Sequence, residues 1–573
     1  MANAKIFPPM SEREIRGAAI SRHAASEGMV LLKNRSAALP LAAGQAIALF
    51  GSGAARTVRG GTGSGDPFNG GLSGGGDVNI NLSPRYHINI LDAMEDDYTV
   101  VSSGLLRDYA VEYDRARDAQ TDHVMSVFAF PEQPLTEEML SGYRSQTGTA
   151  LFVISRNSGE GNDRAMTQQA TIDGQAREIG DYRFAATEKE NLKLLRKMFD
   201  KLVLVLNVAG PISVEDLDET DADAILLMGQ AGQEGGKAVA DILTGRVTPS
   251  GKLTATWARR YEDYPTSGVF LKDPIQAPYP EGIYVGYRYF DTFCKQPGYP
   301  FGYGLSYTTF SLSGCRAALD GETLTFSVEV ANTGRCAGKE VVQLYASAPV
   351  TELDMPAKEL KTALLQPGET ETVTIQLPVQ ALASYSEGKG GYILSKGNYR
   401  FSLGTSSRDT SAVCCLSVPE TRRIRQVDVA LPLQQPLEEL TGWTERPDAG
   451  VWEHVPVLRL EKMPDAVDGR SRYADESVTT YTTDPAYTPV MPYEKVELVP
   501  KADWKLEDVL HGKVSMEAFT AQLSNAQLAD LCCGTGWGVA DADHPVVGSS
   551  SESVPGAAGE TTHQMEDTFG IPS

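Results

Sequence analysis

The sequence predicts two domains of different class along one chain, an α/β layer domain followed by an all-β sandwich. Two observations lead to this prediction. Up to about residue 260, short apolar runs alternate with stretches of helical periodicity, which is typical of a mostly parallel sheet with flanking helices. From about residue 309 to 420 the apolar period becomes two, which is typical of strands with one buried face. A chain of 573 residues is long enough for three or four domains with separate cores.

The predicted α/β domain covers residues 1–260. Its helices include "SEREIRGAAISRHAASEGMVLLKN" and "TEKENLKLLRKMF", both expected on the surface of a sheet, and the second opens with Thr187 and Glu190 as a capping box. A further helix in "GQEGGKAVADILTG" ends at Gly245, a suitable left-handed cap. The expected strands are "AIALFG", "YTVVSS", "ALFVIS", "LVLVLNV" and "DAILLMG".

The rest of the chain divides by composition. Residues 261–308 are rich in aromatics, Gly and Pro and are expected to form an ordered connector. Residues 309–420 contain "LTFSVEVANTG", "VVQLYAS", "ETVTIQL" and "GNYRFSLGTS" and lack a Cys…Trp…Cys pattern, which favours a fibronectin type III-like sandwich over an immunoglobulin one. Residues 421–500 are expected to be an extended linker. Helical spacing resumes in residues 501–573, where Ser524 and Gln527 form a predicted capping box.

Charge and composition exclude several classes of protein. The formal charge of -24 makes nucleic acid or an anionic membrane an unsuitable partner, because the protein's field would repel phosphates. Neither a secretory signal nor a membrane span is visible, so we expect a cytoplasmic location. The seven cysteines and seven histidines show no metal-ligand spacing, which predicts buried or free thiols and no metal.

Two glycine-rich stretches are candidates for phosphate binding, and both fail. "GGTGSGD", residues 60–66, lacks the lysine of a P-loop, and "GSGAAR" has Arg56 where a dinucleotide fingerprint needs its last glycine. Glycines at this density instead allow the backbone to approach a ligand closely, which leaves the Ser64 hydroxyl available for hydrogen bonds. Asp66 is a candidate sugar ligand, with capping of the glycine turn an equally good interpretation.

The stretch "SRNSGEGNDR", residues 155–164, places Glu160 between two glycines directly after the apolar run "ALFVI". A carboxylic acid that protonates a leaving group has to reach the substrate, and a Gly-Glu-Gly loop permits this movement. The alternative is a solvated loop in which Glu160 pairs with Arg156 or Arg164, as surface carboxylates often do. Spacing alone does not decide between the two.

A resemblance to a known family favours the first interpretation. "GGTGSGD" and "SRNSGEGNDR", together with "GQAGQEGGKAVADILTGRVTPSGKLTATW", "EGIYVGYRYFDTF" and "YPFGYGLSYTTF", resemble the β-glucosidase group of the family 3 glycoside hydrolases in order and spacing. The resemblance covers roughly residues 11–420. It implies a retaining β-glycosidase that removes terminal β-linked sugars from a β-glucoside or small oligosaccharide, without a cofactor.

The family's usual domain order differs from the order in this chain. The family normally places a (β/α)8 barrel first, whereas "VSMEAFTAQLSNAQLADLCCG" and "VPGAAGETT" near the C-terminus are similar to the lead-in of that barrel. The chain therefore resembles a permuted member with its barrel last, and we expect residues 501–573 to be an incomplete start of it. The barrel normally supplies the aspartate nucleophile in a Ser-Asp-Trp setting, and no such tripeptide occurs here.

The resemblance also assigns roles to residues. It implies that Glu160 is the general acid/base and that Ser64 contacts the sugar. Asp163 and Arg164 are candidates for orienting the loop, although simply holding the loop together is their favoured role. Glu234 matches a family position, although stabilisation of a helix N-terminus is its favoured role. The missing barrel would come from a longer chain or from a second polypeptide, and the preferred sugar and the oligomeric state, a homo-oligomer included, stay open. The alternative function is a non-catalytic carbohydrate- or protein-binding scaffold.

Overall fold

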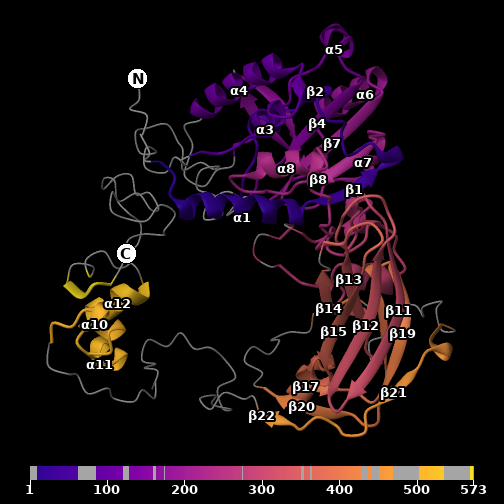
Figure 1. Ribbon diagram of the computed structural model, residues 1–573, viewed down its shortest axis with the longest axis vertical. Coiled ribbons are helices and arrows are strands. Elements are labelled where there is room, and N and C mark those ends of the chain that lie inside the picture. Colours follow the sequence, from indigo (N-terminus) through magenta and orange to yellow (C-terminus); the bar gives the residue numbers. More distant parts are fainter. Residues whose placement is uncertain are drawn as a thin grey trace.

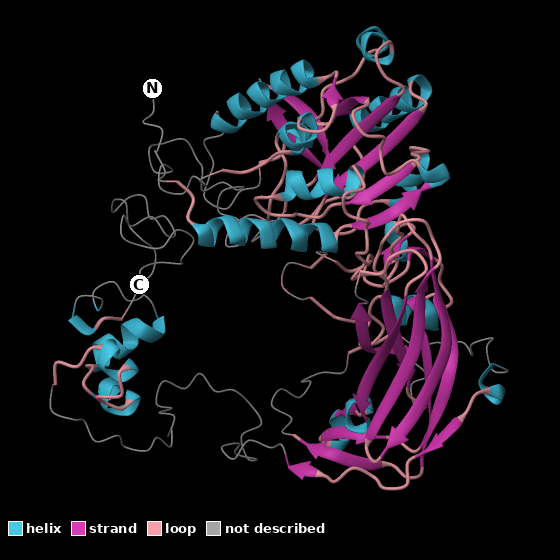
Figure 2. Cartoon of the chain, in the orientation of Figure 1, coloured by secondary structure: helices cyan, strands magenta, loops and turns pink. Residues whose placement is uncertain are grey.

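The α/β domain and the β-sandwich lie end to end in the computed structural model, with three C-terminal helices as a separate group (Figures 1 and 2). Both predicted fold classes are confirmed. The structure describes residues 9–61, 86–119, 128–158, 163–172, 174–270, 272–273, 275, 277–349, 354–361, 364–427, 437–440, 451–468, 502–533, 565 and 568–571.

A six-stranded sheet in the order β1-β8-β7-β4-β2-β3 forms the centre of the α/β domain. All neighbouring strands are parallel except β1, which runs antiparallel to β8. The five strands expected from the apolar runs are all present. The bounds are β1 Val30–Asn34, β2 Ala46–Phe50, β3 Thr99–Val100, β4 Thr149–Ser155, β7 Lys201–Asn207 and β8 Ala224–Leu227.

Helices cover both faces of this sheet, as Figure 1 shows. Alternate residues of each strand enter different cores. Leu49 packs with α3, α4 and α8 on one face, and Phe50 packs with α5, α6 and α7 on the other. The helices are α1 Glu12–Gly28, α2 Ser52–Ala55, α3 Ile90–Glu95, α4 Ser103–Asp118, α5 Glu137–Arg144, α6 Ala186–Met198, α7 Val214–Glu219 and α8 Gly235–Leu243, with a 3-10 turn at Arg35–Ala37.

Two local predictions in this domain were wrong. The helix in the first quoted segment stops at Gly28, and "VLLKN" forms β1, because the β-branched and leucine side chains there pair with β8 in a buried edge of the sheet. The second helix starts before Thr187, and its N-terminal carboxylate is Glu188, which accepts the Ala185 N–H at 2.8 Å. Glu190 instead pairs with Lys193 on the surface. The predicted cap at Gly245 is confirmed by its positive φ of 77°.

The sequence pattern missed a hairpin between β4 and α6. It consists of β5 (Thr167–Ile172) and β6 (Gln175–Gly180), paired in antiparallel register from Thr167 opposite Gly180. Beyond the last pair, the Tyr182 and Arg183 amides donate to the carbonyls of Ala165 and Met166. The hairpin therefore brings residues 163–166 alongside residues 181–183.

The connector is attached to the α/β domain. β10 (Pro297–Tyr299) pairs with β9 (Trp257–Ala258), and Leu305 forms a bridge with Leu31. Between them lie the 3-10 turn Tyr261–Asp263 and α9, Tyr287–Thr292.

The β-sandwich contains sheets in the orders β11-β12-β15, β14-β13-β18-β19-β21 and β16-β17-β20-β22. The expected alternation is present, since Phe326 and Val328 of β12 are buried opposite Phe401 of β18. Residues 421–500 contribute three short strands, β20 to β22, among their described part. The bounds are β11 Phe310–Asp320, β12 Thr323–Asn332, β13 Val341–Ser347, β14 Asp354–Lys361, β15 Thr370–Pro378, β16 Ser384–Ser386, β17 Gly391–Leu394, β18 Gly397–Ser406, β19 Asp409–Val418, β20 Arg422–Gln426, β21 Val457–Arg459 and β22 Val467–Asp468, with 3-10 turns at Val379–Leu382, Glu387–Lys389 and Val451–His454.

Polar contacts join the two domains. Lys252 pairs with Glu340 at 2.7 Å, with both side chains about 11% exposed, and Lys339 pairs with Glu27 at the same distance. The Gln343 amide donates to the carbonyl of Gly302 at 3.1 Å. The sandwich is thus anchored to the connector and to the N-terminal helix.

Three short helices, α10 Leu506–Leu510, α11 Met516–Ala521 and α12 Asn525–Cys533, form the C-terminal group. They share a small core that includes Phe519, Leu523 and Phe569. The predicted capping box is confirmed, because Ser524 and Gln527 exchange side-chain to backbone hydrogen bonds. Within the described part of the chain, no helix has the length and apolar character needed to cross a bilayer.

Candidate active site

The loops that carry Ser64 and Glu160 leave the same edge of the sheet. Parallel strands end on one side, so the segments after β2 and β4 begin next to each other. The chain proceeds from β2 to β3 in one direction and from β3 to β4 in the other, so the strand order reverses between β2 and β4. In open α/β sheets a crevice at such a reversal is the usual ligand site.

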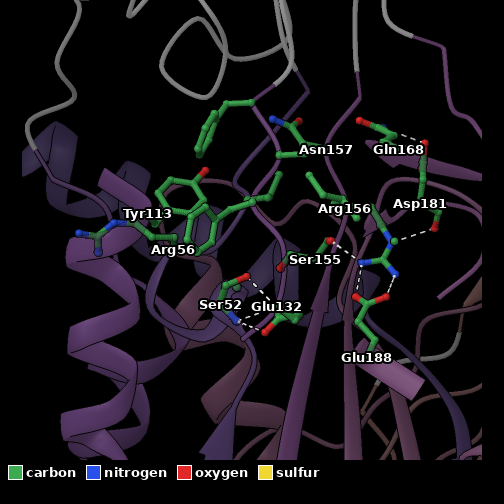
Figure 3. Close-up of a pocket in the computed structure, with 17 residues that line it drawn as sticks. Ser52, Arg56, Tyr113, Glu132, Ser155, Arg156, Asn157, Gln168, Asp181 and Glu188 are labelled. Carbon is green, nitrogen blue, oxygen red and sulfur yellow. Dashed lines mark hydrogen bonds and ion pairs between the residues drawn. The ribbon is translucent and has the colours of Figure 1, made fainter. Parts of the chain in front are cut away.

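A small pocket of about 50 Å³ lies at this reversal (Figure 3). Ser52 and Gly53 line it after β2, and Ser155, Arg156 and Asn157 line it after β4. Three carboxylate residues from other segments, Glu132, Asp181 and Glu188, also line the pocket. The space is too small for a sugar, and its lining comes from the described ends of the segments that follow β2 and β4 and from the residues packed against them.

The Glu132 carboxylate lies at the N-terminus of α2, which is the kind of position where α/β folds in general can bind phosphate. Its carboxylate accepts the Ser52 amide at 2.9 Å and the Ser52 hydroxyl at 2.7 Å. Burial raises the pKa of Glu132 to about 7. A Cβ on Gly53 would lie 1.8 Å from the Ser155 hydroxyl, so the glycine serves close strand packing. An internal carboxylate therefore already uses the donors that "GSGAAR" would offer to a nucleotide.

Arg156 and Glu188 form a buried ion pair on the other side of the pocket. Their side chains are 5% and 4% exposed, and two parallel hydrogen bonds of 2.8 and 2.9 Å join them. Such bidentate pairs fix geometry as well as charge. A Cβ on Gly180 would lie 2.1 Å from the Glu188 carboxylate and 2.4 Å from the guanidinium, so only glycine leaves room for the pair.

Asp181 holds the far side of the loop. Its carboxylate, in a side chain 1% exposed, accepts Arg164 Nε at 2.7 Å, the Ala165 amide at 2.7 Å and Gln168 Nε2 at 2.9 Å. Arg164 also donates to the Pro211 carbonyl at 2.8 Å. Both arginines of "SRNSGEGNDR" therefore have carboxylate partners in the body of the domain.

Of the residues singled out in the sequence, Glu160, Ser64 and Asp66 lie outside the described residues. Asp163 is exposed at the edge of the loop, and Arg164 is partly buried. Glu234 lies at the N-cap of α8 and makes no side-chain cap hydrogen bond; its carboxylate accepts the Tyr86 hydroxyl at 2.6 Å.

Both ends of the segment that contains Ser64 are held by the turn before α8. The Gly232 amide donates to the Arg59 carbonyl at 2.9 Å, and the Ile88 amide donates to the Gln233 carbonyl at 3.1 Å. Asn207, fully buried at the end of β7, adds two hydrogen bonds of 2.8 Å to the backbone of Val58. The bases of the two loops are thus tied to the same sheet edge.

Sequence reasoning missed four polar residues at this edge, of which Asp181, Glu188 and Asn207 are buried and Glu132 is half-buried. Asp181 follows β6 and Asn207 ends β7, positions where polar side chains often serve a site, whereas Glu188 lies in the first turn of α6. Glu188 and Asn207 stood in segments interpreted only as helix or strand, and the segment with Asp181 had no assignment. Glu132, in "FPEQP", gave no periodic signal. Among the described residues, no group of three metal-ligating side chains gathers.

Comparison with known proteins agrees with this architecture. Residues 29–307 match the glycosyl hydrolase family 3 C-terminal domain, and residues 340–407 match a fibronectin type III-like domain. The first match includes the connector.

Relatives extend the similarity beyond these domains. Beta-glucosidase A of Butyrivibrio fibrisolvens is 35% identical over 92% of this chain and 66% of its own length, and a beta-glucosidase of Ruminococcus albus is 31% identical over 89% and 50%. The solved beta-glucosidase of Paenibacillus barengoltzii matches 92% of this chain and 55% of its own at a TM-score of 0.71 and 32% identity. Beta-glucosidase 3B of Thermotoga neapolitana reaches a TM-score of 0.61 at 37% identity over 72% and 55%.

The chain spans between half and two thirds of the length of these relatives. The shared part contains the α/β domain with its sheet-edge loops and the sandwich that follows. Two domains of the chain match family models, and its similarity to the beta-glucosidases extends over most of its length. The chain therefore belongs to glycosyl hydrolase family 3, in its beta-glucosidase group.

Proposed function

We propose that this chain supplies the general acid/base of a retaining β-glycosidase, with Glu160 as that acid/base and Ser64 as a sugar contact. The observation that carries the proposal is the pairing of Arg156 with Glu188 and of Arg164 with Asp181. The alternative interpretation needs one of these arginines to neutralise Glu160. Each already has a buried carboxylate partner, which favours the catalytic interpretation of Glu160 over that pairing.

The nucleophile in this proposal is an aspartate on a (β/α)8 barrel outside these 573 residues. Retaining hydrolysis needs two carboxyl groups about 5 to 5.5 Å apart, one as nucleophile and one as acid and then base. The barrel enters after the C-terminal helices, as the permuted order implies. A single alignment over 92% of this chain supports that order, because it has to extend past residue 500. About a third of that relative's length lies outside the match, enough for a barrel of ~250 residues.

The substrate of the assembled enzyme would be a terminal β-linked glucoside or a small oligosaccharide, as the names of the relatives suggest. Asp163 and Arg164 would orient the loop. The reaction needs no cofactor, because both carboxyl groups come from protein. We further propose a cytoplasmic enzyme with the domain limits given above.

The test uses the chain joined to its barrel, in one polypeptide or as two co-expressed ones. The 573-residue chain alone should release no nitrophenol from nitrophenyl-β-glucoside, and the assembly should release it. Glu160→Ala should lower kcat for a β-glucoside with a poor alkyl leaving group by about 10² to 10⁴, and less for the nitrophenyl substrate, whose departure needs little protonation.

Azide provides the control for the assigned role. It should restore turnover of the nitrophenyl substrate in Glu160→Ala by attacking the glycosyl-enzyme intermediate in place of activated water. An assembly that stays inactive with an intact barrel would instead favour the carbohydrate- or protein-binding scaffold, and full activity of Glu160→Ala would contradict the proposal.

A further inference from the structure

We propose that Asp181 is a positioning residue that joins the two ends of the loop carrying Glu160 and so sets where that acid stands. The inference rests on the proposed function of Glu160. In this inference Asp181 affects the reaction through the position of the loop and does not contact the substrate. Its basis is the pattern of hydrogen bonds around the buried Asp181 carboxylate.

The N-terminal end of the loop is fixed at Arg156. Its Nε donates to the backbone carbonyl of Asp181 at 2.8 Å, while its other nitrogens bind Glu188. Its amide donates to the carbonyl of Asn207 at 3.0 Å. The last residue before the loop is therefore held by β7, α6 and Asp181 together.

The C-terminal end of the loop is fixed by the Asp181 side chain. One carboxylate oxygen accepts Arg164 Nε, and the other accepts the Ala165 amide and Gln168 Nε2. The backbone of Asp181 thus meets one end of the loop at Arg156, as Figure 3 shows, and its carboxylate meets the other end at Arg164 and Ala165. Residues 157–163 span the distance between these two attachments.

The chemistry of this contact requires a carboxylate. Three donors converge on two oxygens, one donor being a guanidinium, and an acid that is ionised offers acceptors only. An amide would turn an NH2 group toward at least one of these donors. A buried ion pair adds little net stability compared with apolar packing, because both charges lose their hydration. Its contribution is therefore geometric, and geometry is what a general acid needs, since a misplacement of about 1 Å costs on the order of 10² in rate.

Trypsin tests the contact on the 573-residue chain without reference to activity. Cleavage after Arg164 requires this side chain to leave Asp181 and the backbone to open. Asp181→Asn should raise the native-state cleavage rate at Arg164 about ten- to a hundred-fold, measured by mass spectrometry of the fragments. The matched control is Asp200→Asn, which removes an exposed pair with Arg144 and should leave that rate unchanged.

A second variant separates the contact from general loss of stability. Arg164→Gln removes the trypsin site but breaks the same pair, so its effect is read from hydrogen exchange of the Ala165 amide. If the two residues act through one contact, exchange in the double variant should be no faster than in Asp181→Asn alone. Additive effects of the two changes, or an unchanged cleavage rate in Asp181→Asn, would overturn the proposal.

Activity of the barrel-containing enzyme distinguishes positioning from a purely structural role. Asp181→Asn should lower kcat for an alkyl β-glucoside at least about ten-fold more than for the nitrophenyl substrate, because only the first needs a well-placed acid. Equal loss on both substrates would overturn the positioning role. If Glu160→Ala itself leaves turnover intact, the proposed function fails, and the catalytic part of this inference fails with it, while the trypsin result still decides whether Asp181 joins the loop ends.

Discussion

The loop-bearing edge of the α/β domain and the core of the β-sandwich bury different kinds of side chain. At the loop-bearing edge of the first domain, Arg156, Asp181 and Glu188 are at least 94% buried and are joined by ion pairs and hydrogen bonds. The sandwich core consists of apolar side chains such as Phe326 and Phe401. The buried amide side chains of Gln343 and Asn332 lie instead at the junction with the connector, where they bind Gly302 and Thr308.

This difference separates interactions that stabilise a domain from interactions that fix the position of a particular side chain or loop. Apolar burial stabilises without regard to direction, so it suits a domain that acts as a support. In a buried ion pair both charges lose their hydration, so such a pair is useful mainly where it fixes a geometry. Here that place is the base of the proposed acid/base loop. We therefore expect substitutions in the two regions to differ in what they disturb. Hydrogen exchange can be followed separately in β4 and β7 and in β12 and β15.

The largest effect is expected for Glu188→Ala. It leaves the Arg156 guanidinium buried without its carboxylate, at a cost of about 3–5 kcal/mol in the α/β domain. Exchange should accelerate in β4 and β7 but not in β12 and β15. Glu190→Ala, two residues further on, removes an exposed pair and should cost less than about 0.5 kcal/mol. Equal losses of stability in the two variants would contradict the expectation that the buried ion pair matters more for stability than the exposed one.

Phe326→Ala tests the other region. This ring is 1% exposed and lies 5.1 Å from the ring of Phe401, so its removal leaves a cavity and should cost about 3 kcal/mol. Exchange should accelerate in β12 and β15 only. Thr325→Ala, on the opposite face of the strand, should cost less than about 1 kcal/mol. Faster exchange in β4 after Phe326→Ala would mean that the domains unfold together.

Gly180→Ala measures how tightly the buried pair is fitted. The added methyl group would overlap the Glu188 carboxylate and the Arg156 guanidinium, so the pair has to shift. We expect a loss of about 2 kcal/mol in the α/β domain, observed by urea unfolding. Gly174→Ala, at the open tip of the same hairpin, adds no steric contact but is strained by a positive φ of 75°, so it provides a backbone-only comparison. A neutral Gly180→Ala would show that the pair adjusts freely.

The smallest effect concerns pH and Glu132. Burial raises its pKa to about 7 from an ordinary 4.5, so between these values the folded chain binds more protons than the unfolded chain. The associated stability is present below pH 4.5 and is lost as pH rises through 7. The shift alone would correspond to about 3 kcal/mol, and because Glu132 is only half-buried, solvent screening reduces this. Compared with Glu132→Gln, the wild type should therefore lose about 1–2 kcal/mol between pH 4.5 and pH 8, measured by urea unfolding at both. Parallel pH profiles of the two proteins would contradict the raised pKa.

The sequence identified much of the fold from short-range pattern. The strands of the central sheet are buried on both faces and appear as continuous apolar runs. The strands of the sandwich are buried on one face and appear as alternating apolar residues. In both cases the local sequence pattern predicts which side chains are buried. "VLLKN" was misjudged because a short apolar run after a helix fits either structure until a partner strand is known. The β5–β6 hairpin was missed because its strands are largely polar and exposed.

By itself, the sequence determined the two domain classes, the position of the Gly-Glu-Gly loop after a buried strand, and the family resemblance. Only the tertiary structure decided which charges meet. Arg156 and Arg164 lie close to Glu160 along the chain, yet their partners are Glu188 and Asp181, brought in by α6 and the hairpin. Apolar periodicity is a local property of the chain and can be recognised in the sequence. An ion pair depends on where distant elements place two charged groups, and the spacing of residues along the sequence does not give the distance between those groups.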